Sequence, residues 1–149
     1  MPSADFRAEV DRNPPLVRVL HGYTQAVLES RAQSMGCDRF HAVEARAARW
    51  LLEMDDRVPQ DTFTMTHEFL AMILGVRRQT VSVAVSQFSR QGCIVDQRGQ
   101  VRIIDRVGLE SVACECYDVV RSAFARLVGP PLPRARKARE VAESSSTGA

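Results

Sequence analysis

The stretch that most restricts the possible folds of this chain is a pair of short helical patterns, 67–74 and 77–91, separated by the dipeptide Gly75-Val76. Thr66 can cap the first helix, because its hydroxyl can accept a hydrogen bond from a free backbone N–H of the first turn. Gly92 follows the second helix, where a left-handed C-terminal cap would fall. Two short helices joined by a turn of about three or four residues that contains glycine describe a helix-turn-helix.

The packing requirements of such a pair are met at several positions. Ala71 is small where the two helices should cross, Gly75 can take a positive φ in the turn, and Val81 is apolar where the second helix should pack back. Helix pairs with alanine and glycine at these positions also occur in ordinary helical cores, so the pair alone leaves both interpretations open. The buried side is completed by Leu70, Ile73, Leu74 and Ala84.

A β hairpin is predicted directly after the second helix. Residues 93–96 and 101–104 have the character of strands, and the connection 97–100 places its glycine where a hairpin turn favours one. Arg98 would lie at the tip of this hairpin and Arg102 on its second strand. We expect the hairpin to be a wing that contacts backbone phosphate through these two arginines, which favours DNA binding over an ordinary core.

The outer face of helix 77–91 has the side chains of a base-reading surface. Arginine can fork onto guanine, glutamine onto adenine, and threonine or serine can hydrogen-bond bases or phosphates. The charge of the region agrees weakly: residues 66–105 carry five Arg against three acidic residues, a net +2, whereas the formal net charge of the whole chain, also +2, implies nothing alone. We expect base contacts from Arg77, Arg78, Gln79, Thr80, Ser82 and Val83.

A long helix is predicted over 15–34, upstream of the helix-turn-helix. Asn13-Pro14 is typical of a helix start, with Asn13 as N-cap and Pro14 at the first helical position, and Gly36 is expected to break or bend the helix. The apolar residues form a narrow stripe at spacings of four, three and four, which favours pairing with another helix over burial in a broad core. The predicted dimer interface consists of Leu16, Leu20, Tyr23 and Val27.

The predicted fold is mainly α with a small β hairpin, a winged helix-turn-helix preceded by a long dimerisation helix. Further helices are predicted over 4–12, 40–54 and 106–128, and a short strand over 63–65. Gly129-Pro130-Pro131 should stop the last helix, and the polar tail after it is expected to be mobile. The chain is thereby divided into 1–36 with a short helix and the dimerisation helix, 37–128 with the DNA-binding domain, and the disordered tail 129–149.

Other classes of function find no support in the sequence. It contains no Gly-rich phosphate loop, no metal-ligand set and no nucleophile–base pair, so we expect neither an enzyme nor a cofactor. No apolar run approaches the roughly 20 residues of a membrane span. The charged N-terminus lacks the apolar core of a signal peptide, so a cytoplasmic protein without membrane contact is expected.

The four cysteines are expected to stay reduced and to hold no metal. Cys37 and His41 are four residues apart and could share a helical face, but two ligands make a poor zinc site, so a role at a helix junction is favoured. Cys114 and Cys116 are two residues apart on a predicted helix and should point to roughly opposite sides. Two cysteines placed in this way cannot readily chelate one ion, so core positions are predicted for both.

Three stretches of the sequence resemble the C-terminal region of Crp/Fnr-type regulators. They are CDRFHAVEARAARWLL, TMTHEFLAMILGVRRQTVSVAVSQFSRQGCI and RIIDRVGLESVACECY, and they occur in this order between Cys37 and Tyr117. The resemblance implies a winged helix-turn-helix with 77–83 as the recognition segment. It also implies three partners: double-stranded DNA, a second copy of the chain bound through helix 15–34, and RNA polymerase.

The same resemblance assigns roles to single residues and shows where this chain departs from the family. Arg78 and Gln79 match base-reading positions, and Thr66 matches a phosphate-contacting position. Many members have Glu-Thr-Val-Ser-Arg where this chain has Gln-Thr-Val-Ser-Val over 79–83, so a different base preference is expected. Arg77 stands where a capping Ser or Thr is common, which should weaken the start of that helix.

A third departure concerns the N-terminal β-barrel sensor of the family. No such barrel is recognisable ahead of the dimerisation helix, where only helix 4–12 resembles the end of the sensor. We therefore expect either a truncated reading frame or a regulator without a sensor.

The sequence thus predicts a homodimeric, sequence-specific DNA-binding transcription regulator. The alternative is an interaction module that does not read DNA and that pairs through helix 15–34 with a full-length homologue to modulate it.

Overall fold

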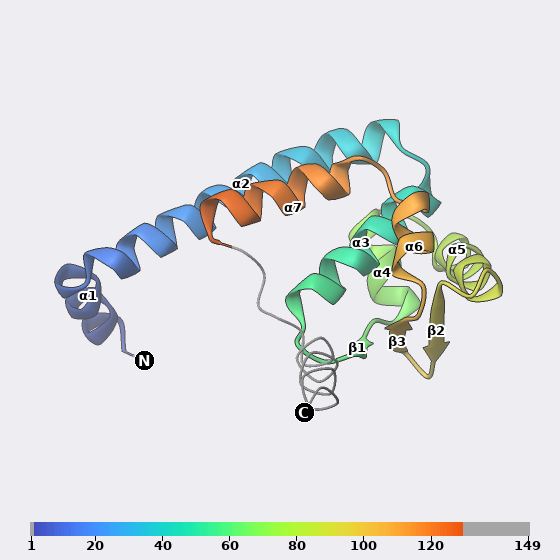
Figure 1. Ribbon diagram of the computed structural model, residues 1–149, viewed down its shortest axis with the longest axis horizontal. Helices are drawn as coiled ribbons and strands as arrows, with labels where there is room; N and C mark the ends of the chain where they lie inside the picture. Colours follow the sequence, from blue (N-terminus) through green and yellow to red (C-terminus); the bar gives the residue numbers. More distant parts are fainter. Residues whose placement is uncertain (1, 130–149) are drawn as a thin grey trace, which may run out of the picture.

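The structure is a computed structural model and describes residues 2–129, so the tail predicted over 129–149 lies, apart from Gly129, outside the described residues. It is mainly helical with one small sheet, as the sequence predicts (Figure 1). Within the described chain, no single helix is long and apolar enough to cross a membrane. In chain order, the elements are α1 (Ser3–Arg12), α2 (Pro14–Phe40), α3 (Val43–Arg57), β1 (Phe63–Thr64), α4 (His67–Leu74), α5 (Arg78–Arg90), β2 (Ile94–Gln97), β3 (Gln100–Ile103), α6 (Arg106–Val112) and α7 (Cys116–Leu127).

The start of the long helix α2 agrees with the sequence prediction, but its end does not. Asn13 caps the helix by accepting a hydrogen bond from the N–H of Leu16 at 3.2 Å, and Pro14 occupies the first position. The break predicted at Gly36 is wrong, because α2 continues to Phe40. A glycine inside a helix costs only about 1 kcal/mol relative to alanine, and burial of the next residue, Cys37, favours one further helical turn.

The single helix predicted over 106–128 is also wrong, because the chain breaks between α6 and α7. Ala113 takes an extended conformation, with φ −66° and ψ 150°, and ends α6. Helix α7 then runs back along α2 (Figure 1). No glycine or proline marks this break, so local sequence signals could not reveal it.

The break at Ala113 changes the surroundings of two cysteines. The expectation that Cys114 and Cys116 point to opposite sides is wrong: both are buried together with Cys37 in a small second core. Burial raises the pKa of the Cys37 thiol to about 12, with the hydrogen bond to Cys114 as the next cause. Burial also raises the pKa of Cys114.

The main core lies between α3, the helix-turn-helix and the sheet. The inward face of α3 includes Ala47 and Leu51, both fully buried, as its apolar spacing predicts. The largest fully buried side chain is nevertheless Arg49, whose Nη1 donates to Glu53 at 2.8 Å. This buried charge pair was not predicted, because helical periodicity identifies apolar faces and not polar groups that bury in pairs.

Helices α2 and α7 are packed closely side by side. A Cβ atom at Gly22 would lie only 2.2 Å from the carbonyl oxygen of Leu127, so this position needs glycine. Ala26, one turn later, is fully buried, and Glu29 accepts a hydrogen bond from Arg126 at 2.9 Å. The predicted dimer residues Leu16, Leu20 and Val27 lie roughly a third of a turn further around the helix axis than this row. Helix α7 therefore occupies a different side of α2.

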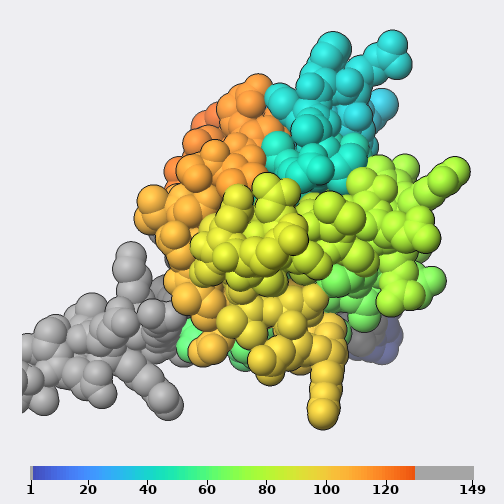
Figure 2. Space-filling model, turned by 90° about the vertical axis from the view of Figure 1, so that its right-hand side faces the viewer, coloured from blue at the N-terminus to red at the C-terminus, as the bar shows by residue number. Residues whose placement is uncertain are grey.

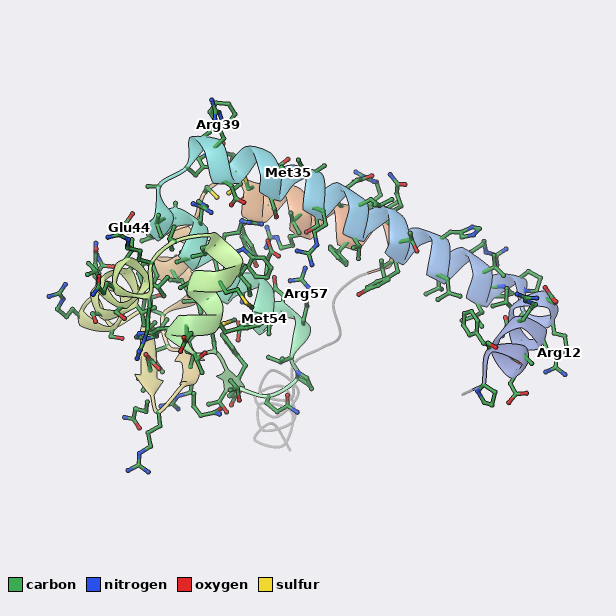
Figure 3. The ribbon with its side chains drawn as sticks, turned by 180° about the vertical axis from the view of Figure 1, so that it is seen from behind. Arg12, Met35, Arg39, Glu44, Met54 and Arg57 are labelled. Carbon is green, nitrogen blue, oxygen red and sulfur yellow. The ribbon has the colours of Figure 1, made fainter. Side chains whose placement is uncertain are left out.

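Tyr23, one of the predicted dimer residues, also contacts α7. Its ring lies edge-on to Phe124, with 6.2 Å between the ring centroids, although 54% of the residue stays exposed. Arg57 lies at the end of α3 (Figure 3), and its guanidinium carbon is 5.0 Å from the centroid of the Phe124 ring. These contacts join α2, α3 and α7 at one aromatic side chain.

Candidate nucleic-acid interface

Helices α4 and α5 have the geometry of a helix-turn-helix. The chain bends by 114° between them, at Gly75, whose φ of 65° lies in the left-handed region that favours glycine. The backbone N–H groups of Gly75 and Val76 bond the carbonyls of Met72 and Ala71 at 3.3 and 3.1 Å. The predicted packing is confirmed for the buried residues Leu70, Ala71, Leu74, Val81 and Ala84.

The first turn of α5 forms an exposed, arginine-led surface. Arg77, Arg78, Gln79 and Thr80 are all exposed, and Val83 is 60% exposed on the next turn. A shallow depression of about 450 Å³ is lined by Arg77, Arg78, Gln79 and Ser82. Among residues 2–129, no hydrogen bond or ion pair is made by the side chains of Arg77, Arg78 and Gln79. The free N–H groups and the helix dipole add positive potential here, so the surface is suited to an anionic, hydrogen-bonding partner.

The start of α5 lacks a side-chain cap, as expected from the arginine at that position. Arg77 is the N-cap residue, and no hydrogen bond runs from its side chain to the first turn. At the other end, Gly92 has a φ of 75° and follows the helix as predicted. Arg77 therefore contributes charge to the exposed surface and no capping bond to the helix.

Ser82 differs from the other predicted base-reading residues because its hydroxyl is already bound within the chain. Its Oγ lies 2.9 Å from Nδ1 of His67, and Nε2 of the same ring lies 2.6 Å from Oδ2 of Asp96. Because a carboxylate only accepts, Nε2 donates to Asp96, and Nδ1 of the neutral ring accepts from Ser82. The structure therefore gives Ser82 a role in joining α4 to α5.

His67 is the residue of this region that the sequence analysis missed. Only 25% of its side chain is exposed, and it connects α4, α5 and β2. Its partners lie 15 and 29 residues further along the chain. No short-range pattern in the sequence marks such distant pairs.

The predicted hairpin is present and belongs to a three-stranded antiparallel sheet in the order β1-β3-β2. Strand β2 lies one residue later than the predicted 93–96, and β3 lies one residue earlier than the predicted 101–104. The short strand predicted over 63–65 is β1. The turn has positive φ at both central residues, 53° at Arg98 and 76° at Gly99. This is the pattern of a type I′ turn, whose twist matches that of the flanking strands.

The wing and the start of α4 lie at one edge of the exposed, arginine-led surface of α5. Arg98 and Arg102 are both exposed, and Figure 2 shows the hairpin projecting below α5 on the face toward the viewer. The N–H of Met65 donates to the carbonyl of Gly99 at 2.9 Å, which holds the wing against the chain just before α4. Thr66 caps α4 as predicted, accepting from the N–H of Phe69 at 3.1 Å.

A polar cluster around Arg106 joins the end of α3 to α6 and α7. Its guanidinium donates to Asp55 at 2.6 Å, to Asp56 at 2.7 Å and to Glu110 at 2.8 Å. The hydroxyl of Tyr117 donates to Asp56 at 2.7 Å. Burial, followed by the bond to Asp56, raises the pKa of Tyr117. The end of α3 is thereby tied to both α6 and α7.

Comparison with known proteins agrees with this geometry. Residues 45–112 match the Crp-like helix-turn-helix domain. None of the curated proteins matches the chain. The match covers α4, α5, the sheet and α6, together with most of α3, and leaves α1, α2 and α7 outside.

Two solved structures with a similar fold are described as transcriptional regulators. A CRP-family transcriptional regulator of Thermus thermophilus is 25% identical, with a TM-score of 0.53 over 76% of this chain and 55% of its own. A protein of Eubacterium rectale assigned to the crp/fnr family is 22% identical, with a TM-score of 0.51 over 74% of this chain and 51% of its own. The chain thus spans about half the length of the solved proteins that it matches.

Proposed function

The chain carries a Crp-like helix-turn-helix domain, and from this premise we propose that it is a sequence-specific DNA-binding transcription regulator. The observation that carries the proposal is the exposed first turn of α5, where Arg77, Arg78 and Gln79 have no partner among residues 2–129. An α-helix fits the major groove, and its first residues reach the base edges. Arg78 and Gln79 would read bases there, together with Thr80 and Val83.

Phosphate contacts would come from the start of α4 and from the wing, which lie together at one edge of the exposed surface of α5. Thr66 starts α4, and Arg98 and Arg102 project from the wing. Contacts of this kind position a protein on the duplex without reading its sequence. Ser82 would instead hold α4 and α5 together and make no DNA contact, because its hydroxyl is held by His67.

The proposed assembly is a homodimer formed through α2. Leu16, Leu20 and Val27 are only half-buried in the single chain, and Tyr23 is exposed. Because α7 covers another side of α2, this stripe remains open to a second copy. Two α5 helices related by a two-fold axis would favour a near-palindromic DNA site.

Other exposed apolar side chains on α2 favour a second candidate function. Val19, Leu28 and Met35 are 52%, 61% and 76% exposed, which is more apolar surface than the predicted stripe alone provides. In this alternative, α2 pairs with a longer homologue, and the chain modulates that protein without reading DNA itself.

The deciding experiment is selection of bound sequences from a random duplex pool with the purified chain. We expect enrichment of a near-palindromic sequence whose binding weakens steeply between low and moderate salt, since released counterions drive phosphate contacts. Arg77→Ala combined with Arg78→Ala should abolish enrichment. Arg18→Ala combined with Arg31→Ala removes the same charge from exposed positions on α2 and should not. Absence of duplex binding, with capture of a longer homologue, would replace the proposal by the alternative.

A further inference from the structure

Four potential metal ligands converge where the end of α2 meets the start of α7. They are the thiols of Cys37, Cys114 and Cys116 and the imidazole of His41, and their ligand atoms all lie within 4.8 Å of one another. The three cysteines are at least 93% buried. In Figure 3, sulfur atoms lie beneath the end of α2 near Arg39, whose own side chain points away from the molecule.

We propose that Cys37, His41, Cys114 and Cys116 bind one Zn²⁺ ion in a closed tetrahedral site. Sets of three cysteines and one histidine are typical of structural zinc. With Zn–S near 2.3 Å and Zn–N near 2.0–2.1 Å, tetrahedral ligand atoms are about 3.5–3.8 Å apart. The Sγ atoms of Cys37 and Cys114 are 3.5 Å apart, and Sγ of Cys116 is 3.6 Å from Nδ1 of His41.

The surrounding residues orient the ligands for such an ion. Nε2 of His41 lies 3.1 Å from the carboxylate of Glu115, which can only accept, so Nε2 carries the proton and Nδ1 turns its lone pair to the cluster. The amide of Gln33 donates to Sγ of Cys116 at 3.0 Å, as a donor does to a metal-bound thiolate. A carboxylate behind a ligating histidine is a recurrent outer partner in zinc sites.

Charge and protons balance in the proposed binding step. Zn²⁺ replaces the protons of three thiols, and up to three protons pass to solvent as three Zn–S bonds form. His41 contributes a neutral ring nitrogen, and no electron is transferred. Four protein ligands fill the tetrahedron and leave no open position for a reacting water, so the site stabilises structure and does not catalyse.

The site would link parts of the chain that are far apart in sequence. Cys37 lies in the last turn of α2 and His41 immediately follows that helix, whereas Cys114 and Cys116 flank the start of α7. The ion would thus hold the α2–α3 corner to the break after α6. This accounts for a break at Ala113 that no local signal explains.

The test begins with the full chain, purified under reducing conditions, loaded with Zn²⁺ and dialysed. Metal analysis should find one zinc per chain, and Co²⁺ in its place should give the intense visible bands of a tetrahedral thiolate complex. Zn²⁺ should displace the cobalt and remove these bands, and a strong chelator should lower the melting temperature. No stoichiometric zinc and no cobalt bands would overturn the proposal.

Variants separate a metal site from an ordinary cysteine core. Cys114→Ser and His41→Ala should each weaken zinc binding at least tenfold, and Glu115→Gln should weaken it about 10-fold or more through the ring orientation. Cys93→Ser is the matched control, because Cys93 is buried and outside the cluster. His41 is partly exposed and can be truncated without opening the core, so its variant remains informative if the cysteine variants do not fold.

Oxidation provides the competing outcome. A disulfide between Cys37 and Cys114 would need the sulfur atoms to approach to about 2.05 Å. It would not explain why Cys116 and His41 lie in the same cluster. If mass analysis finds this bond and the reduced chain still takes up no zinc, the cluster is a redox pair and the zinc proposal fails. Equal zinc binding by Cys114→Ser and Cys93→Ser would also contradict it.

Discussion

The imidazole of His67 and the carboxylate of Asp96 are joined by a hydrogen bond of 2.6 Å between Nε2 and Oδ2. Because Ser82 holds the other ring nitrogen, one side chain of α4 fixes the positions of both α5 and β2. The exposed surface of α5 and the wing are thus oriented by a residue that faces neither of the proposed DNA contacts.

Replacement of His67 should destabilise the domain through loss of these two bonds. We expect His67→Ala to lower the free energy of unfolding by about 1–3 kcal/mol, since two polar partners then lose their bonds. Urea unfolding followed by circular dichroism measures this. Asp96→Asn keeps an acceptor for Nε2 and should cost less. An unchanged urea midpoint for His67→Ala would show that the bonds are not maintained in solution.

Arg78 is expected to read one base. Arg78→Ala should cost about 1–3 kcal/mol of binding free energy at one position of the selected site and should relax the preference there. Titration against duplexes with single-base changes gives the answer, with Arg31→Ala as a control of equal charge. A uniform loss over all duplexes would mean that Arg78 contacts only phosphate.

Arg98 combines a charge that we propose to contact phosphate with a strained backbone. Its φ of 53° is unfavourable for arginine and well suited to asparagine. Arg98→Asn should therefore preserve or slightly raise the melting temperature, while it weakens DNA binding and reduces the salt slope by about 1. Arg98→Lys keeps the charge and should keep the slope. A salt slope equal to wild type in Arg98→Asn would remove Arg98 from the interface.

Arg77 offers the opposite combination of effects. Arg77→Ser introduces the missing N-cap of α5 and should stabilise the domain by about 0.5–2 kcal/mol. It also removes an exposed arginine beside Arg78, so DNA affinity should fall. Thermal unfolding and duplex binding on one preparation test both effects. Loss of stability would show that the Arg77 side chain supports the fold.

The dimer proposal depends on the stripe along α2. Leu20→Glu places a charge in the stripe and should give a monomer in sedimentation at micromolar concentration, with weak specific binding. Ala32→Glu adds the same side chain on another, exposed side of the helix and should stay dimeric. A monomeric wild type at this concentration would refute the dimer through α2.

Local signals in the sequence identify the helix-turn-helix and the wing. Thr66 caps α4, Gly75 turns the chain, and the glycine after Arg98 closes the hairpin, so each boundary is set by residues within a few positions of it. The exposed face of α5 follows from the same helical register. These parts of the fold and the arginine-led surface could be predicted because neighbours along the chain determine them.

Long-range contacts account for what the sequence did not reveal. The break at Ala113 has no turn residue and depends on packing of Cys114 and Cys116 against Cys37, more than 75 residues earlier. His67 meets its partners only because α5 and β2 pack against α4. The buried Arg49 likewise has a distant partner, because its guanidinium donates to Ser34 of α2 at 3.3 Å. Periodicity contains no information on such encounters.

The close approach of Gly22 to Leu127 has a mechanical consequence. A helix joined to its domain by a single corner could swing as a hinge, but α2 is also fastened along its side by α7, about five turns from that corner. It therefore moves with the domain as a rigid lever. In a two-fold pair, this lever would fix the distance between the two half-sites, and DNA with altered spacing would have to twist or bend to be bound.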